Sequence, residues 1–152
     1  MRISLVFLLM LISAATNSQN ASLRQKHFNL SDGVAIQGYD PVAYFLQNKA
    51  IKGRKEIAFA FNGVNYYFAN EADLAEFRKN PGNFEPQYGG WCAYAMGKDG
   101  TKVEVDPETF KIVNGKLFLF YNRLFTNTLK SWNKDETELH NHAEQNWSKI
   151  FH

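Results

Sequence analysis

Residues 57–68 show the clearest pattern in the chain, with large apolar side chains alternating with smaller or polar ones on either side of Asn62-Gly63. Alternation with a period of two is typical of a strand that buries one face. The Asn-Gly pair readily adopts the positive φ angles of a tight type I′ turn. The pattern therefore predicts a β-hairpin from Ile57 to Phe68 that turns at this pair.

A second hairpin of the same kind is predicted from Phe110 to Phe120, with its turn at Asn114-Gly115. The two Asn-Gly pairs lie 52 positions apart, and in each copy an asparagine follows seven residues after the glycine (Asn70 or Asn122), where it can cap a helix. An internal duplication explains this match. Two hairpins that arose independently explain it equally well, because matches this short are weak evidence.

Helix signals flank the hairpins. Asp40 is predicted to cap a short helix from Pro41 to about Leu46, because proline at the first helical position loses no hydrogen bond. Asn70 is predicted to cap a second helix that ends at Asn80. From Arg123 onward the chain is predicted to be helical. Its inner face would carry Leu124, Thr128 and Leu129, and then Leu139, Ala143, Trp147 and Ile150.

Hairpins with separate helices predict an α+β fold, a small domain of two β-hairpins with short helices and a helical C-terminal segment. Aromatic residues make up 15% of the chain, which indicates a core built on rings. Since Cys92 is the only cysteine, one copy of the chain cannot form a disulfide or a Cys-x2-Cys zinc site. Stability must then come from packing, and we expect a monomer or a weak dimer.

The N-terminus is predicted to be a secretory signal peptide. Arg2 precedes an apolar run from Leu5 to Ile12, and small residues follow at positions 13–15, as signal peptidase requires. An uncleaved anchor helix is the alternative, although such a helix needs about 20 apolar residues. We expect a signal peptide at 1–15, a flexible leader at 16–26 and one domain at 27–152. That domain would be periplasmic or secreted, with no membrane span left after cleavage.

The formal net charge of +2 falls to +1 once Arg2 is removed, and the chain has no basic block. Nucleic acid is therefore excluded as a partner on charge. This leaves small ligands, metal ions and proteins as the candidate partners.

An ordered set of motifs resembles the exported, stand-alone YHS domain-containing proteins. The motifs are residues 38–45, residues 66–68, Phe77 with Asn80-Pro81, and residues 88–93, and together they cover nearly all of the mature chain. The resemblance implies a small binding module from a family suspected of binding heavy metals such as copper. Metal-associated members carry two cysteines where this chain has Ala43 and residues 71–74, so their thiol ligands cannot be carried over.

Cys92 and Met96 form the candidate metal site. They lie four residues apart, one turn of a helix, and thiolate and thioether sulfurs are soft ligands that suit Cu(I). A histidine would complete the site, and the candidates are His27, His140 and His142. In the alternative interpretation Cys92 is a small core side chain and Met96 fills a gap, because free cysteine is among the most buried residue types.

The alternative function is a non-metal module that binds a small organic ligand or a protein partner in an aromatic pocket around Cys92. The rings that would line it are Tyr39, Tyr88, Trp91 and Tyr94, and the same rings also suit a hydrophobic core. A nucleophilic Cys92 with a histidine base is the third hypothesis. No hydrolase signature surrounds the thiol, so no catalytic residue is assigned.

Overall fold

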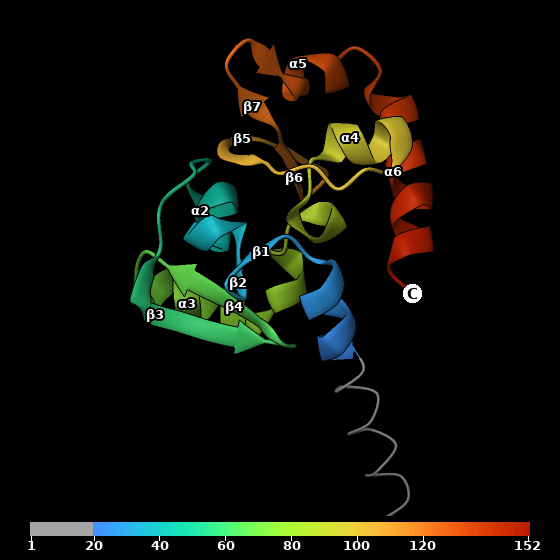
Figure 1. The fold of residues 1–152 in the computed structure, drawn as a ribbon. Coiled ribbons are helices and arrows are strands. Elements are labelled where there is room, and N and C mark those ends of the chain that lie inside the picture. The colour runs from blue at the N-terminus through green and yellow to red at the C-terminus, as the bar shows by residue number, and fades with distance from the viewer. Residues whose placement is uncertain (1–19) are drawn as a thin grey trace, which may run out of the picture.

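The computed structural model describes residues 20–152 (Figure 1). The predicted signal peptide and the first four residues of the predicted leader therefore lie outside the described residues. Residues 20–27 are helical, although the sequence predicted a flexible leader as far as residue 26. Arg24 and Gln25 hold this helix on the first hairpin, because their side chains donate hydrogen bonds to the carbonyls of its turn, Asn62 and Gly63. The local sequence does not reveal these contacts.

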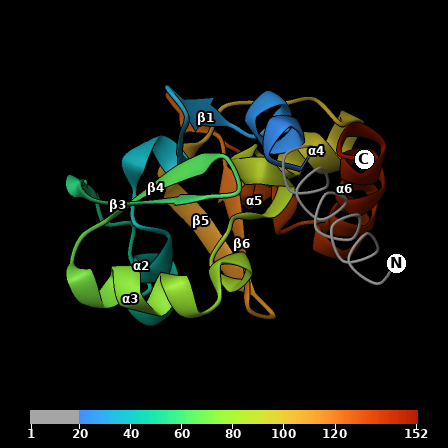
Figure 2. The same ribbon diagram turned by 90° about the horizontal axis from the view of Figure 1, so that it is seen from below.

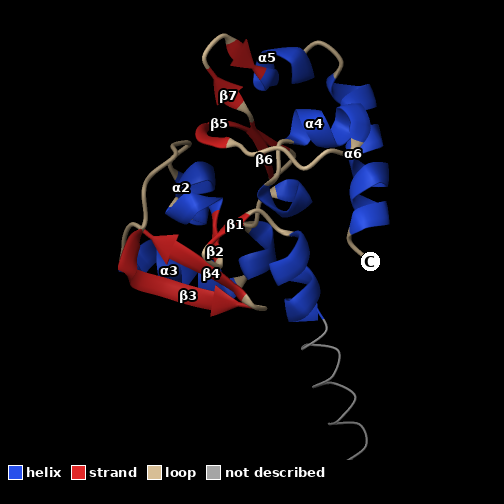
Figure 3. Cartoon of the chain, viewed as in Figure 1, coloured by secondary structure: helices blue, strands red, loops and turns tan. Residues whose placement is uncertain are grey.

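The fold is α+β, as predicted, and Figure 3 distinguishes its helices from its strands. The helices are α2 (Pro41–Leu46), α3 (Glu71–Lys79), α4 (Ala93–Asp99), α5 (Thr128–Trp132) and α6 (Glu136–Ile150), with 3-10 turns η1 (Ile36–Gly38), η2 (Pro81–Asn83) and η3 (Gln87–Gly90). The strands are β1 (Leu30–Ser31), β2 (Val34–Ala35), β3 (Arg54–Phe61), β4 (Val64–Phe68), β5 (Asp106–Val113), β6 (Lys116–Phe120), β7 (Asn122–Arg123) and β8 (Thr126–Asn127).

The strands form one four-stranded sheet and two separate hairpins. The sheet has the order β1-β2-β4-β3, in which β2 runs parallel to β4 and the other pairs are antiparallel. β5 pairs with β6 and β7 with β8. Both predicted Asn-Gly hairpins are present, and their turn residues have the expected positive φ angles, 45° and 81° in the first and 51° and 71° in the second.

The two Asn-Gly hairpins have the same register after a shift of 52 positions. Arg54 pairs with Phe68 in the first hairpin, and Asp106 pairs with Phe120 in the second. In each hairpin the ladder is then interrupted by a bulge immediately after this pair. Two unrelated hairpins have no reason to share strand lengths, register and bulge position.

The segments before the hairpins repeat with the same shift. Each hairpin is preceded by a 3-10 turn with three consecutive residues at positive φ, at 36–38 and at 88–90, and then by a helix that begins at residue 41 or residue 93. A parallel pairing recurs too, Val34 with Asn65 and Pro86 with Leu117. The chain therefore contains a tandem structural repeat, a first repeat at 34–85 and a second repeat at 86–137. The duplication hypothesis accounts for these matches, and independent hairpins do not.

The repeats differ after their hairpins. Asn70 caps α3 as predicted, since its side chain accepts a hydrogen bond from the Asp73 N–H (2.8 Å). Asn122 does not cap a helix: it lies in β7, and its side chain donates to Thr109 Oγ1 (2.9 Å). The helix predicted from Arg123 is absent at this point, because residues 122–127 form the β7–β8 hairpin.

The C-terminal helices begin later than predicted. Asn127 caps α5 by accepting a hydrogen bond from the Leu129 N–H (3.1 Å), and α6 follows after a short turn. The predicted inner face of the last helix is correct, because Leu139, Ala143, Trp147 and Ile150 all pack against one buried cluster. Leu124 was predicted on a helix face but stands exposed at the hairpin tip.

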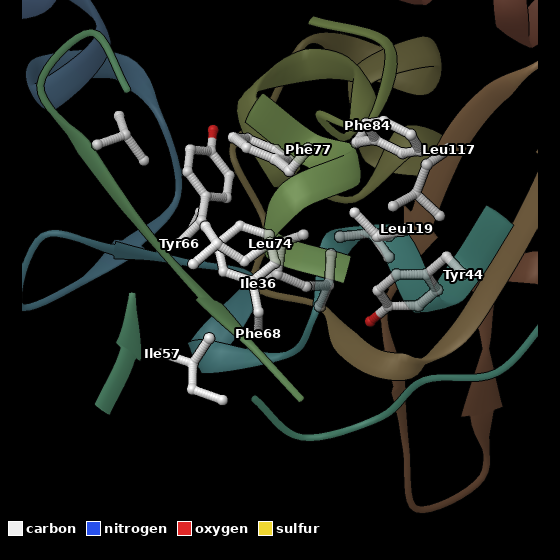
Figure 4. Packing of buried hydrophobic residues seen from close by; sticks show 14 of the residues in the cluster. Ile36, Tyr44, Ile57, Tyr66, Phe68, Leu74, Phe77, Phe84, Leu117 and Leu119 are labelled. Atoms are coloured by element: carbon white, nitrogen blue, oxygen red, sulfur yellow. The ribbon is translucent and has the colours of Figure 1, made fainter. Parts of the chain in front are cut away.

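Two buried clusters stabilise the domain. The first is centred on Phe77 of α3, whose ring lies 4.9 Å from that of Tyr66 and 5.1 Å from that of Phe68 (Figure 4). Leu117 and Leu119 of β6 join it, so the second repeat contributes to the core of the first. The second cluster lies under α6 and contains Tyr88, Ala93, Met96, Phe118, Phe120, Trp132 and Ala143. Seen from below, α2 and α3 lie at one end of the molecule and α4 and α6 at the other (Figure 2).

Candidate functional site

The Cys92 thiol is fully buried at the N-cap of α4. Its sulfur accepts a hydrogen bond from the Tyr121 N–H (3.3 Å) and lies 3.4 Å from Thr128 Oγ1. The Thr128 hydroxyl donates to the Tyr121 carbonyl (2.9 Å), so its single proton is already used and the thiol must be the donor between the two. The three groups thus form a closed ring of hydrogen bonds around the sulfur. A shallow pocket of about 230 Å³ borders Cys92, yet none of the residue's surface is exposed.

Met96 lies one helical turn from Cys92, as predicted, but packs elsewhere. Its side chain belongs to the cluster under α6, whereas Cys92 belongs to the cluster around Phe77. The three candidate histidines do not line the pocket at Cys92. Within residues 20–152, no three His, Cys, Asp or Glu side chains gather closely enough to hold a metal ion. The copper site at Cys92 and Met96 stays a prediction.

The four rings of the predicted aromatic pocket are each engaged separately. Tyr39 lies under the Lys52 ammonium, 4.5 Å from the ring centre. The Tyr88 hydroxyl lies 3.1 Å from Glu144 Oε1, and Trp91 Nε1 donates to the His27 carbonyl (2.7 Å). Tyr94 borders two shallow surface pockets. These contacts do not gather the four rings around one ligand.

A different pocket, of about 360 Å³, lies between the second hairpin and α6. Phe118 of β6 and Trp132 of α5 form its apolar part, and the side chains of Lys116, Glu136 and His140 bring charge and hydrogen-bonding groups to it. The complete lining is Val113, Asn114, Lys116, Phe118, Trp132, Glu136, Thr137 and His140. We call this the α6 pocket.

Two buried nitrogens belong to residues that line the α6 pocket. Within the described part of the chain, Trp132 Nε1 and His140 Nε2 are the buried side-chain nitrogens without a hydrogen-bond partner. The nearest carboxylate oxygen to the imidazole, Glu144 Oε1, is 3.3 Å away but outside hydrogen-bond geometry. Leaving a buried donor unpaired costs about 1–3 kcal/mol, so an indole N–H in this position calls for a partner that the protein does not supply.

The Glu136 carboxylate interacts with the Trp132 indole N–H but does not reach the geometry of a full hydrogen bond with it. Lys111 donates Glu136 a hydrogen bond of 2.5 Å and is the main reason that the pKa of this carboxyl lies below its usual value. Burial acts in the opposite direction, and the hydrogen-bonding interaction with the Trp132 indole N–H adds to the lowering of the pKa. Because the Lys111 ammonium neutralises Glu136, Lys116 is left as the uncompensated charge among the lining residues.

In the first repeat, the place that corresponds to the α6 pocket is filled by Arg24. Its guanidinium lies 5.2 Å from the centre of the Phe61 ring, donates to the Asn62 carbonyl (3.1 Å) and to the Tyr66 hydroxyl (3.4 Å), and forms an ion pair with Glu85. Burial disfavours the charged form, but the Glu85 carboxylate outweighs it and raises the pKa of Arg24. The protein thus places a flat polar group of its own on this site.

Arg24 also lies over the ring of Phe28, which precedes the first repeat. Its other four partners, Phe61, Asn62, Tyr66 and Glu85, correspond 52 positions later to residues of the α6 pocket: Val113, Asn114, Phe118 and Thr137. Two of the changes remove the groups that accept hydrogen bonds from the guanidinium, since the tyrosine becomes Phe118 and the glutamate becomes Thr137. Lys116 replaces Val64 and adds a positive charge. The first site binds a donor of hydrogen bonds, whereas the α6 pocket offers donors.

The sequence contained part of this information. Of the candidate histidines on the last helix, His142 is exposed. His140 instead lies edge-on to the Phe118 ring, with a centroid distance of 5.5 Å, and beside Trp132. The spacing of Glu136, His140 and Ala143 places them on one helix face, and this spacing was the available signal.

Comparison of the chain with protein-family models, with curated proteins and with solved structures finds no match. The resemblance to exported YHS domain-containing proteins therefore stays a prediction. Among residues 20–152, no helix is long and apolar enough to cross a bilayer.

Proposed function

We propose that this chain is a binding module for a small, flat organic ligand that accepts hydrogen bonds, and that the α6 pocket is its binding site. The observation that carries the proposal is the buried indole N–H of Trp132, which lacks a full hydrogen bond, in a pocket whose counterpart holds a flat polar group. Because Trp132 is fully buried, like Cys92, the ligand must displace neighbouring side chains of the pocket to reach this N–H. This is the predicted small-ligand alternative, at different residues. The predicted signal peptide places the module outside the cytoplasm.

The chemistry of the lining defines the class of ligand. The indole N–H of Trp132 is a donor only, so the ligand must present an acceptor oxygen or nitrogen to it. Lys116 favours a negative charge on that end, and the rings of Phe118 and His140 suit a planar apolar body. An aromatic or unsaturated carboxylate combines these features.

Three isosteric probes test this class: benzoate, benzamide and benzamidine share one shape and differ in charge. Each is titrated into the protein while the indole N–H resonances of Trp91, Trp132 and Trp147 are followed by NMR. Trp132→Phe assigns the resonance that matters. We expect benzoate to shift the Trp132 signal at the lowest concentration, benzamide at a higher one, and benzamidine least.

Lys116→Met removes the positive charge at the pocket but keeps an unbranched side chain, so the same titrations separate the contribution of charge to binding from that of shape. We expect it to weaken benzoate binding about fivefold, as the loss of one partly screened charge implies, and to leave benzamide unchanged. The proposal is wrong if none of the probes moves the Trp132 resonance, or if benzamidine binds as tightly as benzoate.

A further inference from the structure

The β7–β8 hairpin carries two large apolar side chains at its tip. Asn122 pairs with Asn127 and Arg123 with Thr126, which leaves Leu124 and Phe125 as the two turn residues. Leu124 is 96% exposed and Phe125 is 103% exposed, the most exposed large apolar side chains among the described residues. Figure 1 shows β7 at the end of the molecule opposite the helix of residues 20–27.

The backbone of this turn does not favour the residues it contains. The other three two-residue turns use Asn-Gly or Asp-Gly, whereas here Leu124 adopts a φ of 53° and Phe125 is not at positive φ. A positive φ at the first turn residue alone is the pattern of a type II′ turn, where glycine is preferred. A branched apolar residue is strained in that conformation. Leu124 is therefore both strained and exposed, and Phe125 beside it is exposed.

Comparison of the repeats shows that this tip is specific to the second one. The corresponding stretch of the first repeat is the start of α3, and the residue that corresponds to Phe125 is Asp73, which is buried. Neither the shared fold nor the core requires an apolar pair at this place. An exposed apolar feature that packing does not explain indicates a surface that meets something else.

We infer that the tip inserts into the interfacial layer of a lipid bilayer, with Leu124 and Phe125 among the upper acyl chains. Arg123 and Lys130 are both exposed near the tip in sequence and would contact lipid phosphates. The size of the tip favours lipid over a protein partner, because two side chains bury far less than the roughly 1,200 Å² of a specific protein interface. A bilayer needs no matching pocket.

Depth measurement at the tip tests the insertion. Because Cys92 is fully buried, Thr126→Cys places the one accessible thiol beside the tip for a nitroxide label. The labelled chain is produced without the predicted signal peptide at 1–15, because its apolar run would itself bind lipid, and is mixed with phosphatidylcholine vesicles, with and without phosphatidylglycerol. We expect oxygen accessibility at the label to rise and accessibility to a water-soluble nickel complex to fall, more strongly with the anionic lipid. A label at the exposed Lys55→Cys of β3 should remain in water with both vesicles. This control excludes binding of the vesicle through the four-stranded sheet.

Variants then show which side chains matter. Leu124→Gly with Phe125→Ser should lower vesicle partitioning about tenfold or more, since two apolar side chains are removed. Because glycine suits the turn, this variant should not unfold more easily, and a denaturation curve checks that. Leu46→Ser, which alters another exposed leucine, should leave partitioning unchanged. Arg123→Gln should weaken binding to the anionic vesicles only, by about fivefold.

A label at position 126 that remains in water with both vesicles would overturn the inference and leave a protein partner as the reason for the exposed tip. Equal partitioning of the wild-type chain and the double variant would overturn it as well. These results do not depend on the α6 pocket, so the inference and the proposed function fail separately.

Discussion

Cys92 and Asp40 occupy corresponding positions in the two repeats and make corresponding contacts. Each is the N-cap of a short helix, and the N–H of each donates to a carbonyl eleven positions later, that of Ile51 (2.8 Å) or Val103 (3.0 Å). Asp40 Oδ2 accepts the Ala69 N–H (2.7 Å), and Cys92 Sγ accepts the N–H of its counterpart, Tyr121. The thiol thus joins the start of a helix to the end of a hairpin, as the carboxylate does in the first repeat.

The buried ring of hydrogen bonds predicts that Cys92 is inert in the folded protein. A thiol reagent added in excess should react at the rate at which the protein opens, and much faster in denaturant. Cys92→Ala should lower the free energy of unfolding by about 2 kcal/mol, because the Tyr121 N–H loses its partner and a small cavity remains. Cys92→Ser keeps a donor and an acceptor, so it should cost less. Fast labelling of the native protein would contradict this account.

The copper hypothesis makes a different prediction for the same variants. If Cys92 and Met96 bind Cu(I), the wild-type chain should take the ion from a competing chelator, and Cys92→Ser and Met96→Leu should each lose that ability. Since the sulfur is enclosed, binding would also have to open the ring with Thr128. Tight binding that survives Cys92→Ser would exclude this site, and no binding by the wild-type chain would exclude the hypothesis.

Local signals predicted the elements that depend on local chemistry. The cap at Asp40, the helix from Pro41 to Leu46 and the turn at Asn62-Gly63 all follow from residues within a few positions of one another. The tip at Leu124 could not be predicted in this way, because leucine has no preference for positive φ and a helical pattern fits the same residues.

The α6 pocket could not be predicted from local sequence patterns either. Trp132 of α5 and His140 of α6 meet Phe118 only because the two C-terminal helices fold back over the second hairpin, and α4 packs closely against α6 at Gly97. The Arg24 site of the first repeat could not be predicted from residue spacing either, because Arg24 comes from a segment that the sequence predicted to be flexible. The aromatic residues near Cys92 in sequence suggested a shared pocket, but in the structure each of them contacts a different set of neighbours.

Asp73→Asn should stabilise the protein at neutral pH. Burial raises the pKa of Asp40 to about 6 and the nearby Asp73 carboxyl adds to this, against the hydrogen bonds from the Ala69 and Val42 N–H groups. A carboxyl whose pKa is raised by folding stabilises the folded state while protonated and loses that contribution as the pH rises from about 4 through about 6. The asparagine removes the second negative charge and should add about 1 kcal/mol above pH 6.

Urea denaturation between pH 4 and pH 8 measures the effect of this change. The difference between Asp73→Asn and the wild-type chain should shrink toward zero as the pH falls below about 6, where Asp40 becomes protonated and the repulsion between the two carboxylates is lost. Glu71→Gln provides the control, since it removes an exposed charge from the same first turn of α3 and should not stabilise at any pH. A gain that is independent of pH would show that repulsion by Asp73 is not the cause.

Gly97→Ala should be strongly destabilising because α4 and α6 touch at this residue. A Cβ there would lie 2.3 Å from the Leu139 carbonyl oxygen, a backbone atom that cannot move aside without shifting α6. We expect a loss of about 3 kcal/mol or more and a weaker response of Trp132 to benzoate, since α6 forms one side of the pocket. Gly82→Ala is the matched control, because nothing lies within 4 Å of its added Cβ. Similar denaturation midpoints for the two variants would refute the close packing.

Arg24→Ala tests whether the first repeat really holds a counterpart of the α6 pocket. Removal of the guanidinium leaves the Glu85 carboxylate with its cation gone, at a site where Arg24 is 6% exposed, and should cost about 3 kcal/mol. The vacated space should then accept a flat cation. We expect benzamidine to raise the melting temperature of Arg24→Ala and benzoate to have no such effect at this site, the reverse of the order expected for the α6 pocket.

Two comparisons make the rescue of Arg24→Ala specific. Benzamidine should not stabilise the wild-type chain, in which Arg24 already fills the site, and it should not stabilise Arg24→Ala with Glu85→Gln, which lacks the negative charge. The repeat then explains both preferences: Glu85 and Tyr66 select a cation in the first repeat, and Thr137 and Phe118 at the corresponding positions remove that selection. Equal stabilisation of all three proteins by benzamidine would show that it acts elsewhere, and the pairing of the two sites would have to be abandoned.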